Sequence, residues 1–361
     1  MVVNQNYTLL AHTFSMEPLY FLPESEINGH VCVTGSSGSG KTVLLGRFAG
    51  SLSREYPTVI ISPHSDLPAM FGGGIKVTED GMGGCGINPI SIRFDLVELY
   101  GVAAVAGRAV DVIERGVEKL GAQQRSLLFD LFRAEADRVK IEGERGCSAG
   151  RMNFSYLERE LLEIAECAEN SRKRSVAESL LDRLKPLSSM PIFSLTEELD
   201  VRSLLNGIHA YDVSRLRGKA KALVCDALFG LLSDYLFSLG PVCSAGYKHR
   251  IFLVVDEAKV FFGEKDRKEC PDHPLNRIAT EGRKYGVSLI AASQRVEHFS
   301  EDFLGSAALQ MVLGPVTDTR QKKKLSSVYG LGSHQVSSLS VPGRAFIESS
   351  TITGGVYYLA L

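Results

Sequence analysis

Short, continuous apolar runs alternate with amphipathic stretches along most of the chain, and this alternation predicts the fold. The runs that predict strands lie at residues 29–35, 58–62, 207–213, 250–255, 287–294, 308–313, 343–347 and 356–361. They are mostly apolar and lack strict polar alternation, which is typical of strands buried on both faces of a parallel sheet. Helical spacing follows several of them, at 42–54, 220–239 and 275–285. The pattern therefore predicts an α/β fold in which helices cover a mostly parallel sheet.

The pattern changes between residues 95 and 187, where apolar residues recur every three or four positions and strand-like runs are missing. We expect a helical insert here, with helices at 95–120, 123–139, 154–167 and 175–187. The charged string at 171–175 is interpreted as a solvated connection between two of them. The expected organisation is an N-terminal extension at 1–25 and one domain at 26–361, interrupted by this insert.

A glycine-rich loop follows the first of these apolar runs. Gly35-Ser36-Ser37-Gly38-Ser39-Gly40-Lys41-Thr42 matches G-x-x-x-x-G-K-[ST] at every fixed position. Its glycines let the backbone turn so that N–H groups face phosphate oxygens, and the next helix adds the positive end of its dipole. Lys41 can reach the β- and γ-phosphates, and Thr42 can ligate Mg²⁺. The sequence predicts a site for ATP and Mg²⁺, with nucleotide-binding residues Gly35, Ser36, Gly38, Ser39, Gly40, Lys41, Thr42 and Val43.

Polar side chains at two further strand ends are candidates for hydrolysis. Asp256 ends the run at 250–255 and is predicted to act on Mg²⁺, from a strand beside the one that carries the glycine-rich loop. Glu257 follows it and can act as the general base on the attacking water. Gln294 ends the next run, at the sheet edge where open α/β folds bind ligands, so we expect it to sense the γ-phosphate or to position the water.

Composition and charge exclude several classes of protein. A net charge of −2 argues against a protein that coats nucleic acid over its whole surface, but it allows a local basic channel. Seven cysteines without C-x-x-C spacing predict neither a zinc site nor a disulfide framework. The N-terminus lacks a signal-peptide pattern, and two aspartates interrupt the apolar stretch at 223–242. We expect a cytoplasmic protein without a transmembrane segment.

The order of several motifs resembles the HerA–FtsK superfamily of P-loop ATPases, and most of all its HerA-like and conjugation-type branch. The motifs are the loop at 35–42, Ile87-Asn88-Pro89-Ile90, the run that ends in Asp256-Glu257-Ala258, Glu281-Gly282-Arg283-Lys284-Tyr285-Gly286 and Ser293-Gln294-Arg295. The string at 281–286 is the distinguishing one. The resemblance covers about residues 26–350 and implies a RecA-like ATPase core, usually a hexameric ring, that moves or unwinds double-stranded DNA.

The same resemblance implies roles for single residues. Arg283 matches an arginine finger that acts in trans, on the nucleotide of a neighbouring subunit. Asp256 and Glu257 match the Mg²⁺ and water-activating acids, and Gln294 matches the sensor. Because the glycine-rich loop begins at Gly35, we expect no N-terminal β-barrel like that of the HerA helicase, which puts ring assembly and nuclease docking through that barrel in question. A nuclease or a membrane complex stays open as a partner.

Two groups of cations are candidates for DNA contact, because a ring translocase binds phosphates without sequence preference. We call the first the basic loop, and it consists of Arg215, Arg217, Lys219 and Lys221. Gly218 lies within it and suggests a mobile pore loop. The second group is Arg320, Lys322, Lys323 and Lys324, which can equally be a solvated start of a helix. Neither group contains interleaved aromatic residues, so stacking on single strands is less favoured.

Three functions remain open from the sequence. The leading one is an ATP-driven motor that translocates or unwinds double-stranded DNA. The second is an ATPase of the conjugation, secretion or virus genome-packaging type. The third, of another class, is a nucleotide-gated assembly switch with slow turnover, which the set of Asp256, Glu257, Gln294 and Arg283 disfavours because a switch does not need all of them.

Overall fold

The computed structural model describes residues 8–117, 119–145, 150–242, 248–260 and 273–360. Contacts divide the chain into two compact units. The first unit comprises residues 1–76, 201–214 and 239–361, and the second comprises residues 77–200 and 215–238.

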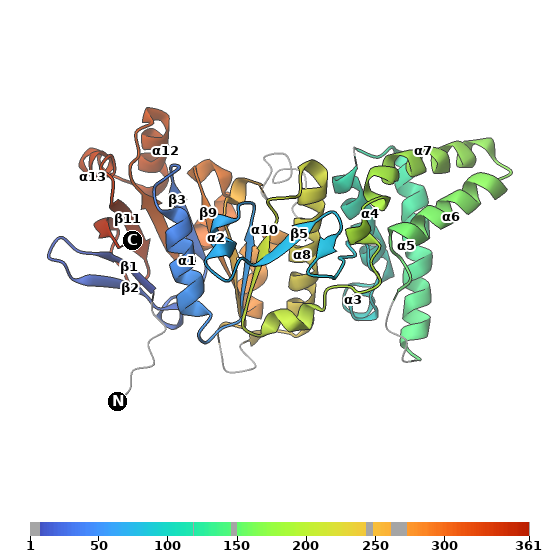
Figure 1. Cartoon of the computed structure of the whole chain (residues 1–361), viewed down its shortest axis with the longest axis horizontal. Helices are drawn as coiled ribbons and strands as arrows, with labels where there is room; N and C mark the ends of the chain where they lie inside the picture. The colour runs from blue at the N-terminus through green and yellow to red at the C-terminus, as the bar shows by residue number, and fades with distance from the viewer. Residues whose placement is uncertain (1–7, 118, 146–149, 243–247, 261–272, 361) are drawn as a thin grey trace. The chain divides into compact units, whose positions relative to one another are not determined.

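The first unit is built on a mixed sheet whose central strands are parallel (Figure 1). From one edge the order is β2-β1-β12-β11-β10-β3-β9-β8-β4-β7, and the start of β5 pairs with β7. Pairing is parallel from β10 to β5 and antiparallel from β2 to β10. The bounds are β1 (Thr8–His12), β2 (Pro18–Phe21), β3 (Val31–Gly35), β4 (Thr58–Ser62), β5 (Ile75–Thr78), β7 (Ile208–Asp212), β8 (Ile251–Val255), β9 (Val287–Ser293), β10 (Leu309–Leu313), β11 (Arg344–Ser349) and β12 (Gly355–Leu359).

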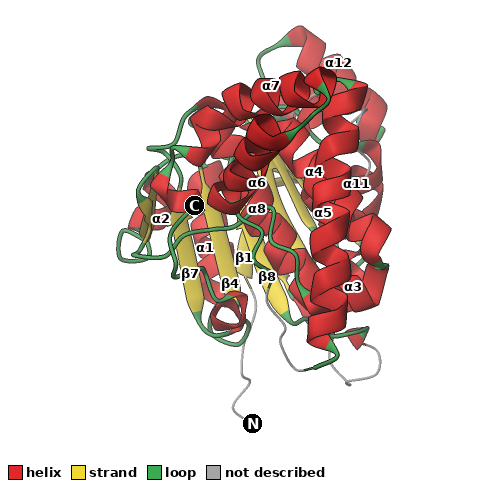
Figure 2. Cartoon of the chain, turned by 90° about the vertical axis from the view of Figure 1, so that its right-hand side faces the viewer, coloured by secondary structure: helices red, strands yellow, loops and turns green. Residues whose placement is uncertain are grey.

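Continuous apolar sequence corresponds to complete burial in this sheet. Every residue of β3, β4, β8 and β9 is buried, and β4 lies between β7 and β8 (Figure 2). Helix α1 packs Leu44, Leu45 and Phe48 into the same core. The prediction of a mostly parallel sheet covered by helices is confirmed. The helices of this unit are α1 (Lys41–Leu52), α2 (Asp66–Ala69), α10 (Pro274–Glu281), α11 (Glu301–Ser306), α12 (Thr319–Tyr329) and α13 (Ser333–Ser338).

The second unit is mainly helical, and its helices α6 and α7 form a hairpin (Figure 1). Its helices are α3 (Phe94–Tyr100), α4 (Val102–Gly116), α5 (Ala122–Gly143), α6 (Phe154–Cys167), α7 (Ser171–Ser188) and α8 (Gly218–Ser238), and β6 (Gly81–Met82) pairs with the end of β5. Five of the helices, α3 to α7, occupy the segment for which the sequence predicts an insert. Two ion pairs join α4 to α8: Arg108 with Asp234, and Arg115 with Asp226 at 3.1 Å.

Two helix predictions in the insert were wrong. The helix expected at 95–120 is two helices, α3 and α4, which divide at Gly101, where the φ angle is 85°. The second error concerns the start of α7. The charged string at 171–175 is the first turn of α7, although the sequence suggested a connection. The Asn170 side chain accepts a hydrogen bond of 2.9 Å from the Arg172 N–H and so caps the helix. A capping asparagine allows a helix to begin at once, and the charges of its first turn stay exposed.

Candidate functional site

The glycine-rich loop at residues 35–42, called the P-loop from here on, connects β3 to α1 in the conformation that its glycines allow. Gly38 and Gly40 have φ angles of 76° and 91°, in the left-handed region that favours glycine. A Cβ on Gly35 would lie 2.4 Å from Ser39 Oγ and 3.0 Å from Leu313 Cβ, so a larger residue would distort the loop. The buried Ser39 Oγ has no hydrogen-bond partner among the described residues. Thr42 is half-buried and Val43 is exposed.

Lys41 lies across this loop and is buried. Its Nζ donates to the carbonyl oxygens of Gly35 at 2.7 Å and of Ser36 at 2.9 Å. Burial lowers the pKa of Lys41, while the negative charges of Glu257 and Asp256 oppose that shift. The ammonium group is therefore held beside the loop and within the field of both acids.

Asp256 is buried directly after β8, and its backbone N–H donates to the Ile61 carbonyl at 3.3 Å. Burial raises the pKa of its carboxyl group, and the nearby charge of Glu257 raises it further. His64 and Lys41 act in the opposite direction. Burial makes the ionised form of this carboxyl group unfavourable, and a cation placed beside it would stabilise that form.

Glu257 contacts the next strand. Its φ is 52°, in the left-handed region that residues other than glycine rarely adopt. Gln294 Nε2 donates to Glu257 Oε2 at 3.1 Å, and Ser293 Oγ lies 3.4 Å from Glu257 Oε1. The structure thus brings together two residues for which the sequence predicted a common role.

The strand order corrects one expectation. The sequence suggested that the strand of Asp256 lies beside the P-loop strand, but β9 lies between β8 and β3. The neighbours of the P-loop strand are β9 and β10. Gln294, at the end of β9, is therefore carried by the strand next to the P-loop, between it and the acids.

Two residues that sequence reasoning did not single out contact this group. His298 Nδ1 lies 2.7 Å from Ser293 Oγ. Gln321, buried on α12, donates from Nε2 to the Gln294 carbonyl at 3.0 Å. No spacing in the sequence indicates these contacts, and the only available signal was that both residues follow strand ends of the predicted sheet.

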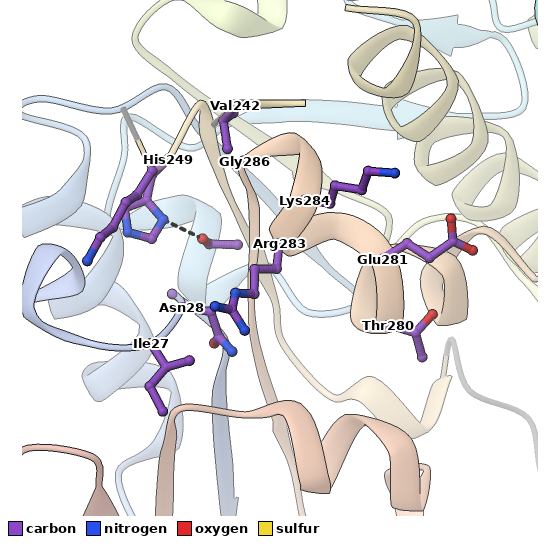
Figure 3. Close-up of a pocket in the computed structure, with 12 residues that line it drawn as sticks. Ile27, Asn28, Val242, His249, Thr280, Glu281, Arg283, Lys284 and Gly286 are labelled. Atoms are coloured by element: carbon purple, nitrogen blue, oxygen red, sulfur yellow. Dashed lines mark hydrogen bonds between the residues drawn. The ribbon is translucent and has the colours of Figure 1, made fainter. Parts of the chain in front are cut away.

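Arg283 and the P-loop lie at opposite ends of the parallel strands. It belongs to η6 (Gly282–Tyr285), which precedes β9, whereas the P-loop follows β3, and β3 and β9 are parallel. Arg283 and Lys284 are both exposed, and Arg283 points toward Asn28 while Lys284 points away from it (Figure 3). The hollow that they line has a volume of about 610 Å³. The structure does not bring Arg283 to the P-loop of its own chain.

Behind Arg283 lie two buried histidines. His249 Nδ1 and Ser288 Oγ are 2.9 Å apart, and His30 Nδ1 accepts from the Leu289 N–H at 2.9 Å. Burial lowers the pKa of His30 to about 4, helped by the positive charges of His249 and Arg283. Burial also lowers the pKa of His249.

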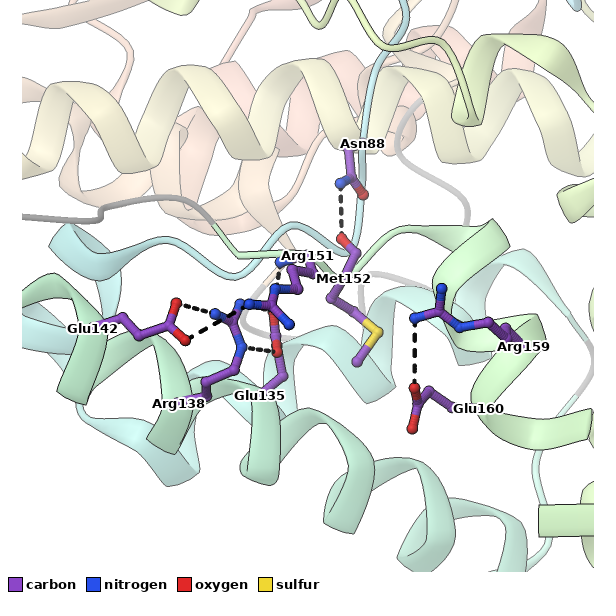
Figure 4. Close-up of polar contacts among 8 residues, drawn as sticks. All are labelled: Asn88, Glu135, Arg138, Glu142, Arg151, Met152, Arg159 and Glu160. Atoms are coloured by element: carbon purple, nitrogen blue, oxygen red, sulfur yellow. Dashed lines mark hydrogen bonds and ion pairs between the residues drawn. The ribbon is translucent and has the colours of Figure 1, made fainter. Parts of the chain in front are cut away.

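The asparagine–proline motif at 87–90 has a structural role in the second unit. Asn88 is buried, and its Nδ2 donates to the Met152 carbonyl at 2.9 Å (Figure 4). Nearby, the buried Glu135 carboxylate accepts two hydrogen bonds from Arg138, at 2.7 and 2.8 Å, and one from the Arg151 N–H. These bonds hold Arg151 and Met152, which precede α6, to α5 and to Asn88.

The basic loop, also in the second unit, is only partly a loop. Arg215 and Arg217 precede α8, but Lys219 and Lys221 belong to its first turn, contrary to the expectation of one mobile loop. The first three cations are exposed and Lys221 is half-buried. The second group of cations, in the first unit, starts α12, where Arg320, Lys323 and Lys324 are exposed.

The residues at the P-loop edge fit ATP and Mg²⁺. The side chains of Thr42 and Asp256 carry oxygen atoms, the ligand type that a hard cation prefers, and Mg²⁺ is commonly held by one or two protein oxygens together with substrate phosphates. Among the described residues no group of three or more histidine, cysteine, aspartate or glutamate side chains can hold a metal by itself. The buried Ser39 hydroxyl and the loop N–H groups suit phosphate oxygens.

The fold and this edge define the class of protein. A mostly parallel sheet with the P-loop on an inner strand is the architecture of a RecA-like P-loop ATPase core. Residues 12–232 match the family described as the helicase HerA central domain. The match spans more than half of the chain, and so the chain belongs to this family, within the HerA–FtsK type of P-loop ATPases.

Curated relatives agree with this assignment. The DNA double-strand break repair helicase HerA of Sulfurisphaera tokodaii is 21% identical over 342 residues, which are 90% of this chain and 63% of that protein. HerA of Sulfolobus acidocaldarius is 24% identical over 219 residues, 59% of this chain and 43% of that protein. The chain therefore matches less than two thirds of the length of these relatives.

Solved structures show the same fold. VirB4 of Thermoanaerobacter pseudethanolicus superimposes with a TM-score of 0.71 at 17% identity, covering 98% of this chain and 96% of that one. The bacterial conjugative coupling protein TrwB gives a TM-score of 0.63 at 16% identity and covers 97% of this chain and 88% of that one.

Among the described residues, no helix combines the length and the apolar character needed to cross a membrane.

Proposed function

We propose that this chain is an ATP-hydrolysing motor that translocates or unwinds double-stranded DNA as part of a hexameric ring. The ATPase part rests on one observation, the 3.1 Å hydrogen bond between Gln294 Nε2 and Glu257 Oε2 at the strand edge that carries the P-loop. A switch that only binds nucleotide has no need for an acid–amide pair at this place. HerA, a DNA repair helicase by name, supports DNA as the substrate of the motor.

Each residue of the site has a distinct task in this proposal. Lys41 exchanges the neutral carbonyls of Gly35 and Ser36 for charged phosphate oxygens, which are stronger acceptors. Thr42 and Asp256 would hold Mg²⁺, and the ion would supply positive charge to offset that of the nucleotide phosphates.

Glu257 accepts the proton of the attacking water, and Gln294 orients that water while it senses the γ-phosphate. The direct contact of 3.1 Å between Gln294 Nε2 and Glu257 Oε2 supports a joint role of the two side chains on that water.

Arg283 supplies the remaining cation to the nucleotide of a neighbouring subunit. Its place at the far edge of its own sheet, and its exposure there, support a role across a subunit boundary. A guanidinium group can pair with two phosphoryl oxygens at once, which a lysine cannot do. This placement supports a ring in which each subunit completes the next site.

DNA contact is assigned to the basic loop, with the cations of α12 as the alternative. Exposure of Arg215, Arg217 and Lys219 supports the first, since phosphate contacts need accessible cations. Neither group is interleaved with aromatic residues, which suits binding to the backbone of a duplex.

The test is steady-state ATPase activity with and without double-stranded DNA, together with light scattering in the presence of nucleotide. We expect turnover that DNA stimulates and a mass of six subunits. Nucleotide binding without turnover would favour the assembly switch. Turnover that DNA does not change would instead favour a conjugation- or secretion-type ATPase that acts on protein.

A further inference from the structure

Three side chains form a line that ends at the proposed base. Ser293, at the end of β9, is fully buried, and its hydroxyl lies 2.7 Å from His298 Nδ1 and 3.4 Å from Glu257 Oε1. An ionised carboxylate only accepts hydrogen bonds, so the single Ser293 proton must serve the contact with Glu257. The shorter contact then requires a proton from the imidazole, which makes His298 Nδ1 the donor.

We propose that His298 is a positioning residue for ATP hydrolysis. Its Nδ1–H donates to Ser293 Oγ and thereby directs the Ser293 proton to Glu257 Oε1. With Oε2 held by Gln294, both oxygens of the base are then fixed, and the carboxylate faces the water in one orientation. This inference rests on the proposed function, since it concerns the same base.

The backbone explains why Glu257 needs such support. Its left-handed φ of 52° turns the side chain away from the strand direction, and the side chain is only half-buried. A glutamate in that setting has several rotamers open to it, and ordering them costs free energy. Two hydrogen bonds from one rigid strand end select a single rotamer before substrate arrives.

The surroundings of His298 are suited to this task. His298 is the last residue of the short helix η7 (Val296–His298). The first residue of this helix, Val296, is 1% exposed, and Phe299, which follows the helix, is 3% exposed. The packed core therefore fixes the place from which the imidazole donates. The Ser293–Glu257 contact of 3.4 Å is long, and contacts of this kind commonly shorten when the substrate binds.

The first experiment separates turnover from binding. We expect His298→Ala to lower kcat about tenfold, the size expected when a hydrogen bond that serves an ionised group is lost. Nucleotide affinity, measured directly with a fluorescent ATP analogue, should stay within about twofold, which also shows that the variant is folded. His298→Asn places an amide donor near the position of Nδ1 and should recover most of the loss. His334→Ala, which removes an exposed histidine of α13, is the matched control.

The second experiment tests the path through the serine. Ser293→Ala should lower kcat by a similar factor, and adding His298→Ala to it should cause no further loss. Equal losses from His298→Ala in both backgrounds would overturn the positioning role, as would a loss confined to nucleotide affinity or no recovery in His298→Asn.

Failure of this inference is distinguishable from failure of the proposed function. If wild-type protein hydrolyses ATP and Glu257→Gln does not, while His298→Ala turns over normally, only the positioning role falls. If wild-type protein binds ATP without hydrolysing it, the proposed function falls and the role of His298 falls with it. If Glu257→Gln turns over at the wild-type rate, another acid is the base, and the role of His298 falls although ATP hydrolysis stands.

Discussion

Replacing Arg283 with alanine tests whether one active site is built from two subunits. Arg283 precedes the first residue of β9, whereas Gln294 follows the last, and the strand has seven residues. At the usual rise per residue, roughly 20 Å separates the two sheet edges. An arginine side chain cannot span that distance, so any phosphoryl group that Arg283 contacts directly must belong to a nucleotide of another subunit.

The expected size of the effect follows from the charge that Arg283 would neutralise. Arginine fingers contribute about 10³–10⁵ in turnover in other phosphoryl-transfer systems. We therefore expect Arg283→Ala to bind ATP nearly as the wild type does and to hydrolyse it at least about 10³-fold more slowly. Lys284→Ala is the matched control, because Lys284 is adjacent and exposed but points away from Arg283 (Figure 3).

Mixing variants decides the assignment. Arg283→Ala and Lys41→Ala subunits are each expected to be inactive alone. In a mixed ring, some boundaries combine an intact Lys41 site with an intact Arg283 donor, and turnover returns in part. Co-purification of two differently tagged variants shows whether mixed rings form. If they form and no ratio restores activity, Arg283 does not act on the nucleotide of a neighbouring subunit.

Three further results are expected. In ATP-binding and single-turnover assays, Lys41→Ala should lose turnover and weaken binding, whereas Glu257→Gln should trap bound ATP; wild-type turnover in the latter would show that another acid is the base. Replacing all four cations of the basic loop by alanine should flatten the salt dependence of DNA binding by roughly one unit of slope per lost contact; an unchanged slope would move the DNA site to α12. His30 stays neutral in the folded protein to about pH 4, but protonates near pH 6.5 when unfolded. Urea unfolding at pH 5 should therefore show about 2 kcal/mol less stability than at pH 8 from this residue, and His30→Asn should lose that part.

Much of this fold could be predicted because its local patterns are unambiguous. Continuous apolar runs corresponded to the buried strands, and the P-loop conformation follows from glycines at positions with φ angles that other residues avoid. The candidate site could be assembled for a related reason. In parallel strands, residues that follow strand ends lie at one edge, so Asp256, Glu257 and Gln294 were expected to lie near the P-loop.

Strand order and long-range hydrogen bonds could not be predicted in the same way. Nothing in the run before Asp256 indicates that β9 separates its strand from the P-loop strand, because every inner strand is equally apolar. Contacts such as Gln321 to Gln294 join residues 27 positions apart and depend on how α12 packs. The start of α7 was not predicted because the charges at 171–175 are typical of a solvated connection, whereas the capping residue Asn170 allows a helix to begin there.

Strand β9 connects the two parts of the proposed mechanism. Its end presents Ser293 and Gln294 to the base of its own site, and Arg283 lies four residues before its first residue. All seven residues are buried, and the strand pairs with β3 on one side and β8 on the other, so it moves as a rigid element with its neighbours. A displacement of Gln294 when the γ-phosphate leaves would therefore displace Arg283 as well. In a ring whose sites are completed by Arg283, hydrolysis in one subunit would change the next site without any further moving part.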